Sequence, residues 1–208
     1  MFKRNKGYFL LIMLVLTGLA GRIHSDSLTG KERRFLTDHL KESREQFLAS
    51  FRGLNEEQLN FRSAPGKWSV KDCIMHLALA EQGLWTMTEN TLKQPANPEK
   101  RTEIKVTDEQ LIKMVSSRDQ KATAPETLDP TKTAKWASAK DAVHDFKKGR
   151  SHLIKYVKTT TEDVRNHVTQ FATGYVDAYQ LMLLISAHTL RHTAQIKEVM
   201  ADPNFPKK

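Results

Sequence analysis

The chain has 208 residues, with 33 lysines and arginines, 24 aspartates and glutamates, and a formal net charge of +9. This length supports one domain with a sizeable core, and hardly two. The basic residues are spread along the chain without a dense block, which argues against a nucleic-acid-binding surface. The only cysteine, Cys73, excludes an intramolecular disulfide, so stability must come from a packed core.

The first 25 residues have the pattern of a secretory signal peptide. A basic start is followed by an uncharged apolar run, residues 7–20, and small residues end this run. The run is shorter than the ~20 residues that a spanning helix needs, although an uncleaved anchor is the alternative. Cleavage after Ala20 or after Ser25 would give an exported protein, periplasmic or secreted, without stable membrane insertion. Cleavage after Ala20 would also remove three basic residues and leave a smaller positive excess.

Four long segments with helical periodicity follow the leader. They are residues 31–54, 69–92, 138–159 and 177–201. In each of them apolar residues recur every three to four positions, with charged residues on the opposite side. Ser69 is a good N-cap for the second helix, and Asp72 can complete a capping box. The sequence therefore predicts an all-α fold, a four-helix bundle over residues 31–205.

A polar segment, residues 93–135, separates the second predicted helix from the third and contains most of the prolines. One short helix is predicted within it, Asp108–Ser117, with Thr107 or Asp108 as its N-cap. We expect the segment to form an ordered excursion over one end of the bundle. The only possible strand lies near Thr169–Tyr175.

Three histidines fall on the predicted inner faces of two helices. His188 and His192 lie one turn apart on the apolar stripe of the last helix, and His76 lies on that of the second. Each alone is more often a core histidine bonded to a neighbour or to water. Three buried imidazoles without partners would cost on the order of several kcal/mol, whereas a divalent metal binds neutral imidazole. The pattern predicts one metal held by His76, His188 and His192, with at least one coordination position open.

Other polar residues near these histidines have simpler explanations. Cys73, one turn before His76, is a possible fourth ligand, but a small thiol also packs well in a core. Asp72 could orient an imidazole, although capping already explains it. Gln195 either hydrogen-bonds a metal ligand or a bound water, or only packs. Glu81 lies about 140° around the helix from His76, which favours a structural role over that of a base.

The sequence names no general base. Thr189 follows His188, so the H-E-x-x-H motif of metalloproteases is absent. His39 flanks the apolar stripe of the first helix and is expected to be peripheral. The remaining histidines show no clustering with the three candidates: His24, His144, His152 and His167.

Two stretches resemble the signature sequences of the DinB/YfiT-like superfamily of metal-dependent enzymes. PGKWSVKDCIMHLALAE (Pro65–Glu81) is similar to the family's Trp-Ser helix start followed by a ligand histidine. LMLLISAHTLRHTAQIKEV (Leu181–Val199) is similar to its H-x-x-x-H-x-x-Q-I helix. The excursion resembles that of a subgroup with an inserted segment. The likeness covers about residues 32–205.

The resemblance implies a bundle that holds one divalent ion, often zinc or nickel, through His76, His188 and His192. Some relatives are thiol S-transferases that use low-molecular-weight thiols, and many have no assigned reaction. Those thiols are cytosolic, whereas the leader predicts export, which counts against that reaction here. The leading hypothesis is an exported metal-dependent hydrolase or transferase of an unknown small-molecule substrate. The alternatives are a non-catalytic small-ligand-binding protein and a bundle with structural histidines.

Relatives commonly pair, so we expect a homodimer through outer helix faces. Light scattering at micromolar concentration tests this expectation, and a monomer would exclude it.

Overall fold

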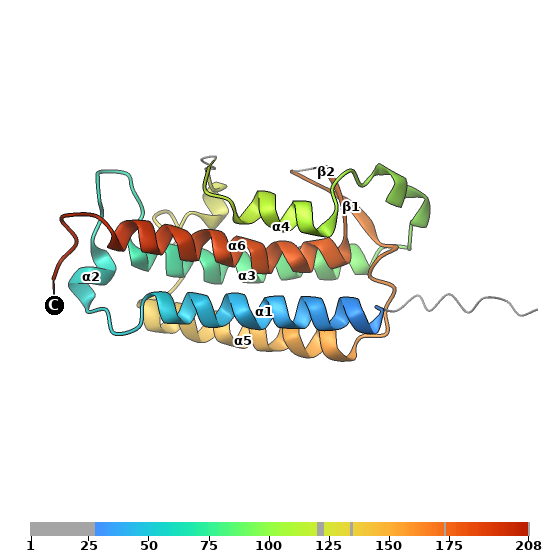
Figure 1. The fold of residues 1–208 in the computed structure, drawn as a ribbon, viewed down its shortest axis with the longest axis horizontal. Coiled ribbons are helices and arrows are strands. Elements are labelled where there is room, and N and C mark those ends of the chain that lie inside the picture. The colour runs from blue at the N-terminus through green and yellow to red at the C-terminus, as the bar shows by residue number, and fades with distance from the viewer. Residues whose placement is uncertain (1–27, 120–122, 134, 173, 208) are drawn as a thin grey trace, which may run out of the picture.

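The computed structural model describes residues 28–119, 123–133, 135–172 and 174–207, and the predicted signal peptide lies outside them. In this part of the chain, four long helices form a bundle (Figure 1). They are α1 (Gly30–Ser50), α3 (Val70–Leu92), α5 (Ala139–Thr159) and α6 (Ala178–Met200). Helices α1 and α3 each pack against both α5 and α6. The predicted all-α four-helix bundle is confirmed.

Shorter elements connect the long helices. They are α2 (Glu56–Asn60), the 3-10 helices η1 (Pro98–Glu103) and η2 (Glu126–Leu128), α4 (Asp108–Ser116), β1 (Val168–Phe171) and β2 (Gly174–Asp177). The two strands pair antiparallel, with Thr169 opposite Val176. This hairpin confirms the strand expected near Thr169–Tyr175.

Side-chain caps explain where the helices begin. Thr29, Asn55, Ser69 and Thr107 each form a complete capping box at the start of a helix. The end of α1 was predicted less well, because the helix stops at Ser50 and not at residue 54. Gly53 adopts a φ of 77°, a left-handed conformation that a helix cannot continue through.

The excursion between α3 and α5 runs along the bundle, which corrects the expectation that it covers one end. Helices α3 and α5 point in the same direction, so the chain must return along the bundle between them (Figure 1). Helix α4 makes this return while packed against α6. Its path brings the residues that follow α4 to the C-terminal half of α6, where Arg191 donates to the Ser117 carbonyl and Arg118 pairs with Glu198.

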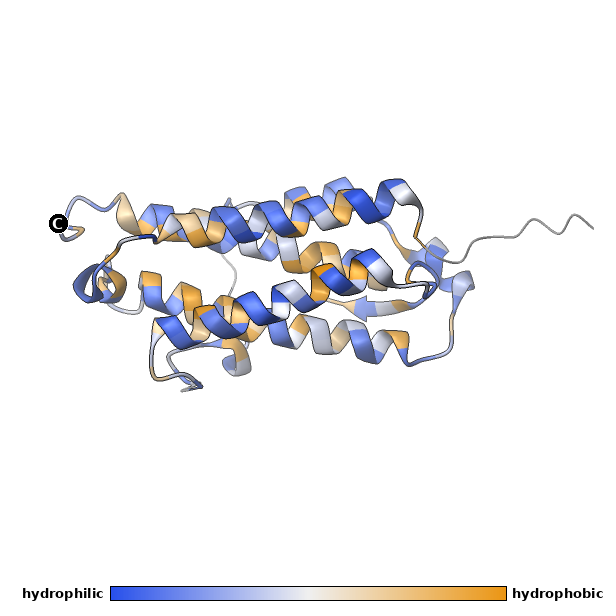
Figure 2. Ribbon diagram, turned by 90° about the horizontal axis from the view of Figure 1, so that it is seen from below, coloured by the Kyte–Doolittle hydropathy of each residue, from blue (hydrophilic) through white to orange (hydrophobic). Residues whose placement is uncertain are grey.

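The core is divided by a buried polar layer. Two hydrophobic clusters occupy the two ends of the bundle; the first includes Leu40 and Leu153, and the second includes Phe47 and Phe146. Between them lies Arg150, which is fully buried. Figure 2 shows how hydrophobic and hydrophilic residues alternate along each long helix. Helical periodicity places Met87 on the inner face of α3, but its side chain is exposed.

The Arg150 side chain contacts all four long helices. From α5 it donates to both carboxylate oxygens of Glu81 on α3, each at 2.7 Å. It also donates to the Leu40 carbonyl and the Ser43 hydroxyl on α1, both at 2.9 Å, and to the Thr189 hydroxyl on α6 at 2.8 Å. Every part of the guanidinium is thereby paired, as burial of a charge requires.

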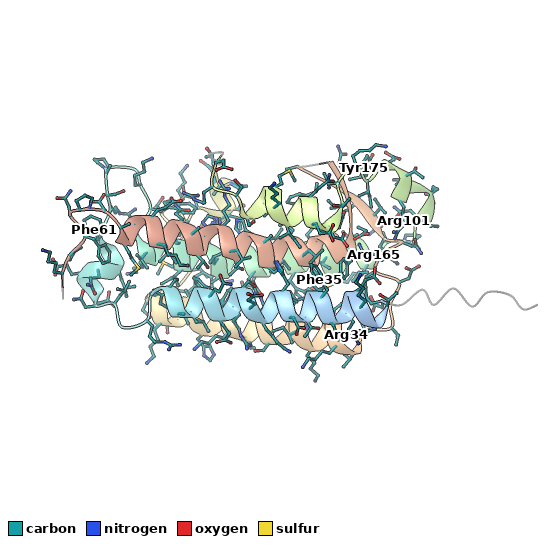
Figure 3. The ribbon with its side chains drawn as sticks, viewed as in Figure 1. Arg34, Phe35, Phe61, Arg101, Arg165 and Tyr175 are labelled. Carbon is teal, nitrogen blue, oxygen red and sulfur yellow. The ribbon has the colours of Figure 1, made fainter. Side chains whose placement is uncertain are left out.

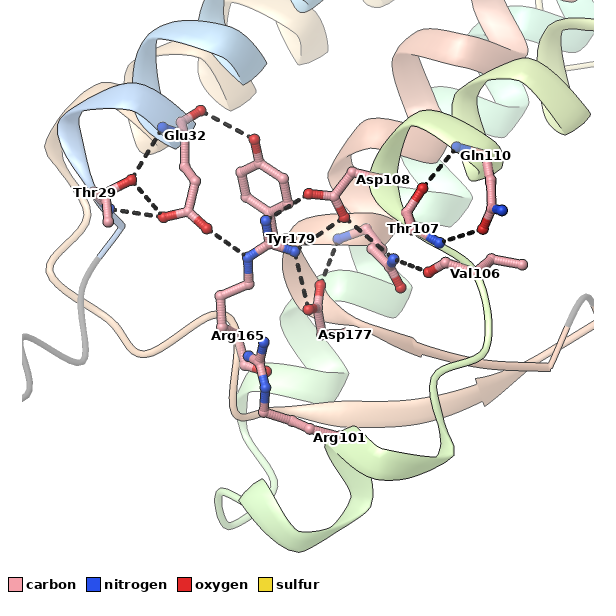
Figure 4. A network of polar contacts seen from close by, with 11 residues as sticks. Thr29, Glu32, Arg101, Val106, Thr107, Asp108, Gln110, Arg165, Asp177 and Tyr179 are labelled. Carbon is pink, nitrogen blue, oxygen red and sulfur yellow. Dashed lines mark hydrogen bonds and ion pairs between the residues drawn. The ribbon is translucent and has the colours of Figure 1, made fainter.

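A second arginine fastens one end of the bundle. Arg165 precedes the hairpin and forms ion pairs with Glu32 on α1, Asp108 on α4 and Asp177, the N-cap of α6 (Figures 3 and 4). Its guanidinium also lies 3.7 Å from the centre of the Tyr179 ring. These contacts hold the start of α6 against α1 and α4. Within the described residues, none of the helices combines enough length and apolar character to cross a membrane.

Candidate metal centre

The three histidines singled out in the sequence converge in the structure. His76 projects from α3, and His188 and His192 project from α6, which packs against α3. The His188 Nε2 atom lies 3.3 Å from Nε2 of His76 and 3.1 Å from Nε2 of His192. Among the described residues, these three form the group of potential metal ligands, with one ligand atom of each inside a 4.8 Å span. The predicted convergence is confirmed.

Hydrogen bonds on the far side of two rings determine which nitrogen carries the proton. Nδ1 of His76 lies 2.7 Å from the carbonyl oxygen of Leu128, which can only accept. Nδ1 of His192 lies 2.8 Å from Oε1 of Gln195, also an acceptor. Both Nδ1 atoms must therefore donate, and each neutral ring presents an unprotonated Nε2 to the centre. Gln195 is thus a hydrogen-bond partner of a candidate ligand, one of the two predicted roles.

The three Nε2 atoms cannot all be paired by hydrogen bonds among themselves. His188 Nε2 can donate one proton at most, and it faces two lone pairs. At least one of the two close contacts would then oppose lone pair to lone pair. A cation among the three atoms removes this conflict. The nitrogen spacings of 3.1 and 3.3 Å are near the edge of a tetrahedron with ligands about 2.0–2.1 Å from its centre, so the donor set fits a divalent ion.

Burial keeps the three rings neutral. Desolvation, together with smaller effects of the neighbouring His76 and Arg191, lowers the pKa of His188 to about 3. Desolvation also lowers the pKa of His76 and, to a greater extent, that of His192. Neutral imidazole is the form that binds a metal.

Metal-free protein should lose stability as the pH falls below about 6.5. Histidines in an unfolded chain bind protons near that pH. Burial holds the folded pKa of His188 to about 3 and lowers those of the other two. Between these values the unfolded chain binds more protons, so the free energy of unfolding decreases by up to about 1.4 kcal/mol per pH unit for each histidine.

Urea unfolding with a chelator present, between pH 7.5 and 5, measures this slope. The variant His188→Gln has one titrating ring fewer and should show a shallower slope than the natural chain. Equal slopes would contradict the prediction.

An aromatic ring closes one side of the centre. The Trp68 ring centre lies 4.7 Å from that of His76 and 5.9 Å from that of His192. Trp68 directly precedes the N-cap of α3, so its place follows from the helix start. An apolar wall here excludes water and strengthens electrostatic interactions with whatever binds.

The other candidates have structural roles. Cys73 is buried in the second hydrophobic cluster outside the histidine group, and burial raises its pKa to about 12. Asp72 completes the capping box of α3 and pairs with Arg62. Glu81 pairs with Arg150, which is a structural role of the kind that its position around the helix favoured. His39 is half-buried, with Nδ1 2.7 Å from the Ser186 hydroxyl.

The remaining histidines do not join the group. His144 and His152 are exposed, His167 lies beside the hairpin, and His24 lies outside the described residues.

Sequence reasoning missed the contributions of the excursion. The Leu128 carbonyl belongs to the backbone, and no residue pattern marks such an acceptor. Arg118, which donates to Gln195, lies in a polar segment without periodicity. The place of Trp68 beside the site was only weakly indicated by the sequence, through its position directly before the N-cap residue Ser69.

The fold and the site together define a four-helix bundle with a three-histidine cluster, built from facing helices, that could hold a metal. The model of the DinB superfamily matches residues 39–196, and the chain belongs to this superfamily.

A solved structure with a similar fold is YfiT from Bacillus subtilis, described as a probable metal-dependent hydrolase with an unusual four-helix bundle topology. The two chains are 15% identical, the likeness covers 84% of this chain and 89% of YfiT, and the TM-score is 0.56. At this identity the likeness establishes the fold alone. A comparison with curated proteins gave no match.

Proposed function

We propose that the protein binds one divalent metal ion, zinc or nickel, through Nε2 of His76, His188 and His192. The observation that carries this proposal is the convergence of three Nε2 atoms, two of which must bear lone pairs because their rings donate from Nδ1. The Leu128 and Gln195 contacts are the outer bonds that orient metal-binding imidazoles. The YfiT description as a probable metal-dependent hydrolase supports the same conclusion.

We further propose that the site acts on a small molecule, as an exported hydrolase or transferase. Three protein ligands leave a coordination position open, and an ion there supplies Lewis acidity to a substrate group or a water. The protein's own part is to orient the rings and to shield the site with Trp68. Within the described residues no carboxylate joins the histidine group. This observation favours the second candidate function, binding of a small ligand without turnover.

Metal analysis of the purified protein, followed by a screen of thiol and ester substrates, tests the proposal. We expect about one zinc or nickel ion per chain, and turnover that is lost in His188→Ala. Metal with saturable ligand binding but no turnover would select the binding protein. A natural chain without bound metal, which also fails to take up added Zn²⁺ or Ni²⁺, would refute both.

Export is tested separately. The mature protein is expected to begin near Gly21 or Asp26, because the apolar run is short and small residues follow it. N-terminal sequencing of protein from the cell envelope or the medium measures this start. An intact Met1 on a cytosolic product would contradict export and leave the metal site unaffected.

A further inference from the structure

Arg118 follows α4 and reaches α6 beside the histidine cluster. Its Nε and Nη2 atoms donate to the two carboxylate oxygens of Glu198, at 3.1 and 2.8 Å. Its Nη1 atom donates to Oε1 of Gln195 at 3.3 Å. The same segment is fastened to α6 a second time, because Arg191 donates to the Ser117 carbonyl. The Arg118 guanidinium is therefore held in one orientation.

This orientation determines which way the Gln195 amide faces. Its oxygen accepts from Nη1 of Arg118 and from Nδ1 of His192. If the amide rotated by half a turn, its NH₂ group would face the guanidinium, which has only donors. Arg118 thus favours the orientation in which the Gln195 amide oxygen faces the guanidinium and Nδ1 of His192. An oxygen beside Nδ1 of His192 in turn requires the imidazole proton to be on Nδ1.

We propose that Arg118 is a positioning residue of the metal centre. Through Gln195 it holds His192 as the Nδ1-protonated tautomer, which leaves Nε2 free to bind a metal. The inference rests on the proposed function, and it gives the excursion between α3 and α5 a role in orienting a candidate metal ligand. Leu128, further along the same excursion, fixes the tautomer of His76 in the same way. Arg118 and Leu128, both in the excursion, therefore determine that Nε2 is the nitrogen available for metal binding on His192 of α6 and on His76 of α3.

The tautomer can be measured without any metal. Proton–nitrogen correlation NMR of the imidazole rings, at pH 7.5 with a chelator, distinguishes Nδ1–H from Nε2–H. The His192 signals are assigned from their absence in His192→Gln. We expect Nδ1–H in the natural chain and a mixture with Nε2–H in Arg118→Ala, where the Gln195 amide is free to rotate. The unfolding temperature should change little, since the ion pair between Arg118 and Glu198 is partly solvated, with the two side chains 30% and 52% exposed.

Metal affinity gives the second measurement. Zn²⁺ or Co²⁺ titration of Arg118→Ala should show binding weakened about tenfold, the lower end of the usual effect of changing an outer hydrogen bond, because Arg118 acts through Gln195. Arg118→Lys keeps a donor near Gln195 and should recover part of the loss. Glu198→Gln removes the carboxylate that holds Arg118 and should shift the tautomer in the same direction, which provides a second test if Arg118→Ala folds poorly. Arg44→Ala, at a partly exposed ion pair on α1 far along the sequence from the three clustered histidines, should change neither measurement.

An unchanged His192 tautomer in Arg118→Ala and Glu198→Gln, or Nε2–H in the natural chain, would overturn the inference. Failure of the proposed function looks different. A natural chain that binds neither Zn²⁺ nor Co²⁺, but whose His192 tautomer still responds to Arg118, would refute the metal site and leave Arg118 as the residue that sets the tautomer.

Discussion

Replacing His188 by alanine should lower the affinity for Zn²⁺ by more than about 100-fold. His188 Nε2 is the atom that contacts both other Nε2 atoms, so its loss leaves two ligands on different helices. Changes to outer hydrogen bonds already cost about 10–100-fold in metal affinity, and loss of a direct ligand should exceed that range. Competition with a chromogenic chelator measures the affinity, and His76→Ala and His192→Ala should behave alike.

Metal binding should also raise the unfolding temperature of the natural chain and not that of His188→Ala. A ligand that binds only the folded state stabilises it by about 2.7 kcal/mol at 100 times its dissociation constant. Thermal unfolding with and without added Zn²⁺ shows the difference. His144→Ala and His152→Ala are the matched controls, because both side chains are exposed on α5. Equal affinity in His188→Ala and in these controls would refute the site.

Periodicity was sufficient to place the histidines of this site. His76, His188 and His192 share their helix faces with apolar residues, and an inward direction follows from helical geometry alone. Their meeting in space also needs α3 to pack against α6, which the resemblance to a known family supplied and the structure confirms. Capping residues such as Ser69 could also be predicted from the sequence, because a cap acts within one turn of its helix.

The parts that sequence reasoning missed depend on contacts between distant segments. The Leu128 carbonyl meets His76 only because α3 and α5 run in the same direction and force the excursion back along α6. The buried ion pair of Glu81 could not be predicted, because its partner, Arg150, lies on another helix. An isolated charge on a helix is usually solvated, and nothing local shows that two such charges are buried together.

The Arg150–Glu81 pair is expected to matter for stability in a way that neither residue does alone. Both side chains are buried between the two hydrophobic clusters, so removing one leaves the other as an unpaired charge. If both are removed, the neighbouring hydroxyls still have partners. Ser43 donates to the Leu40 carbonyl, and Thr189 donates to the Ile185 carbonyl. Paired apolar replacement therefore creates no orphaned donor among these groups.

Arg150→Met and Glu81→Met should each lower the free energy of unfolding by about 3–5 kcal/mol, the usual cost of breaking a buried ion pair. The double variant should be far less destabilised than the sum of the two, because desolvation of both charges is then avoided. Urea unfolding of the metal-free chain measures all three values. Arg44→Met, which removes a partly exposed ion pair on α1, should cost no more than about 1 kcal/mol. Additive losses in the double variant would show that Arg150 and Glu81 do not act as a pair, and that contacts such as Arg150 with Thr189 hold the four helices together instead.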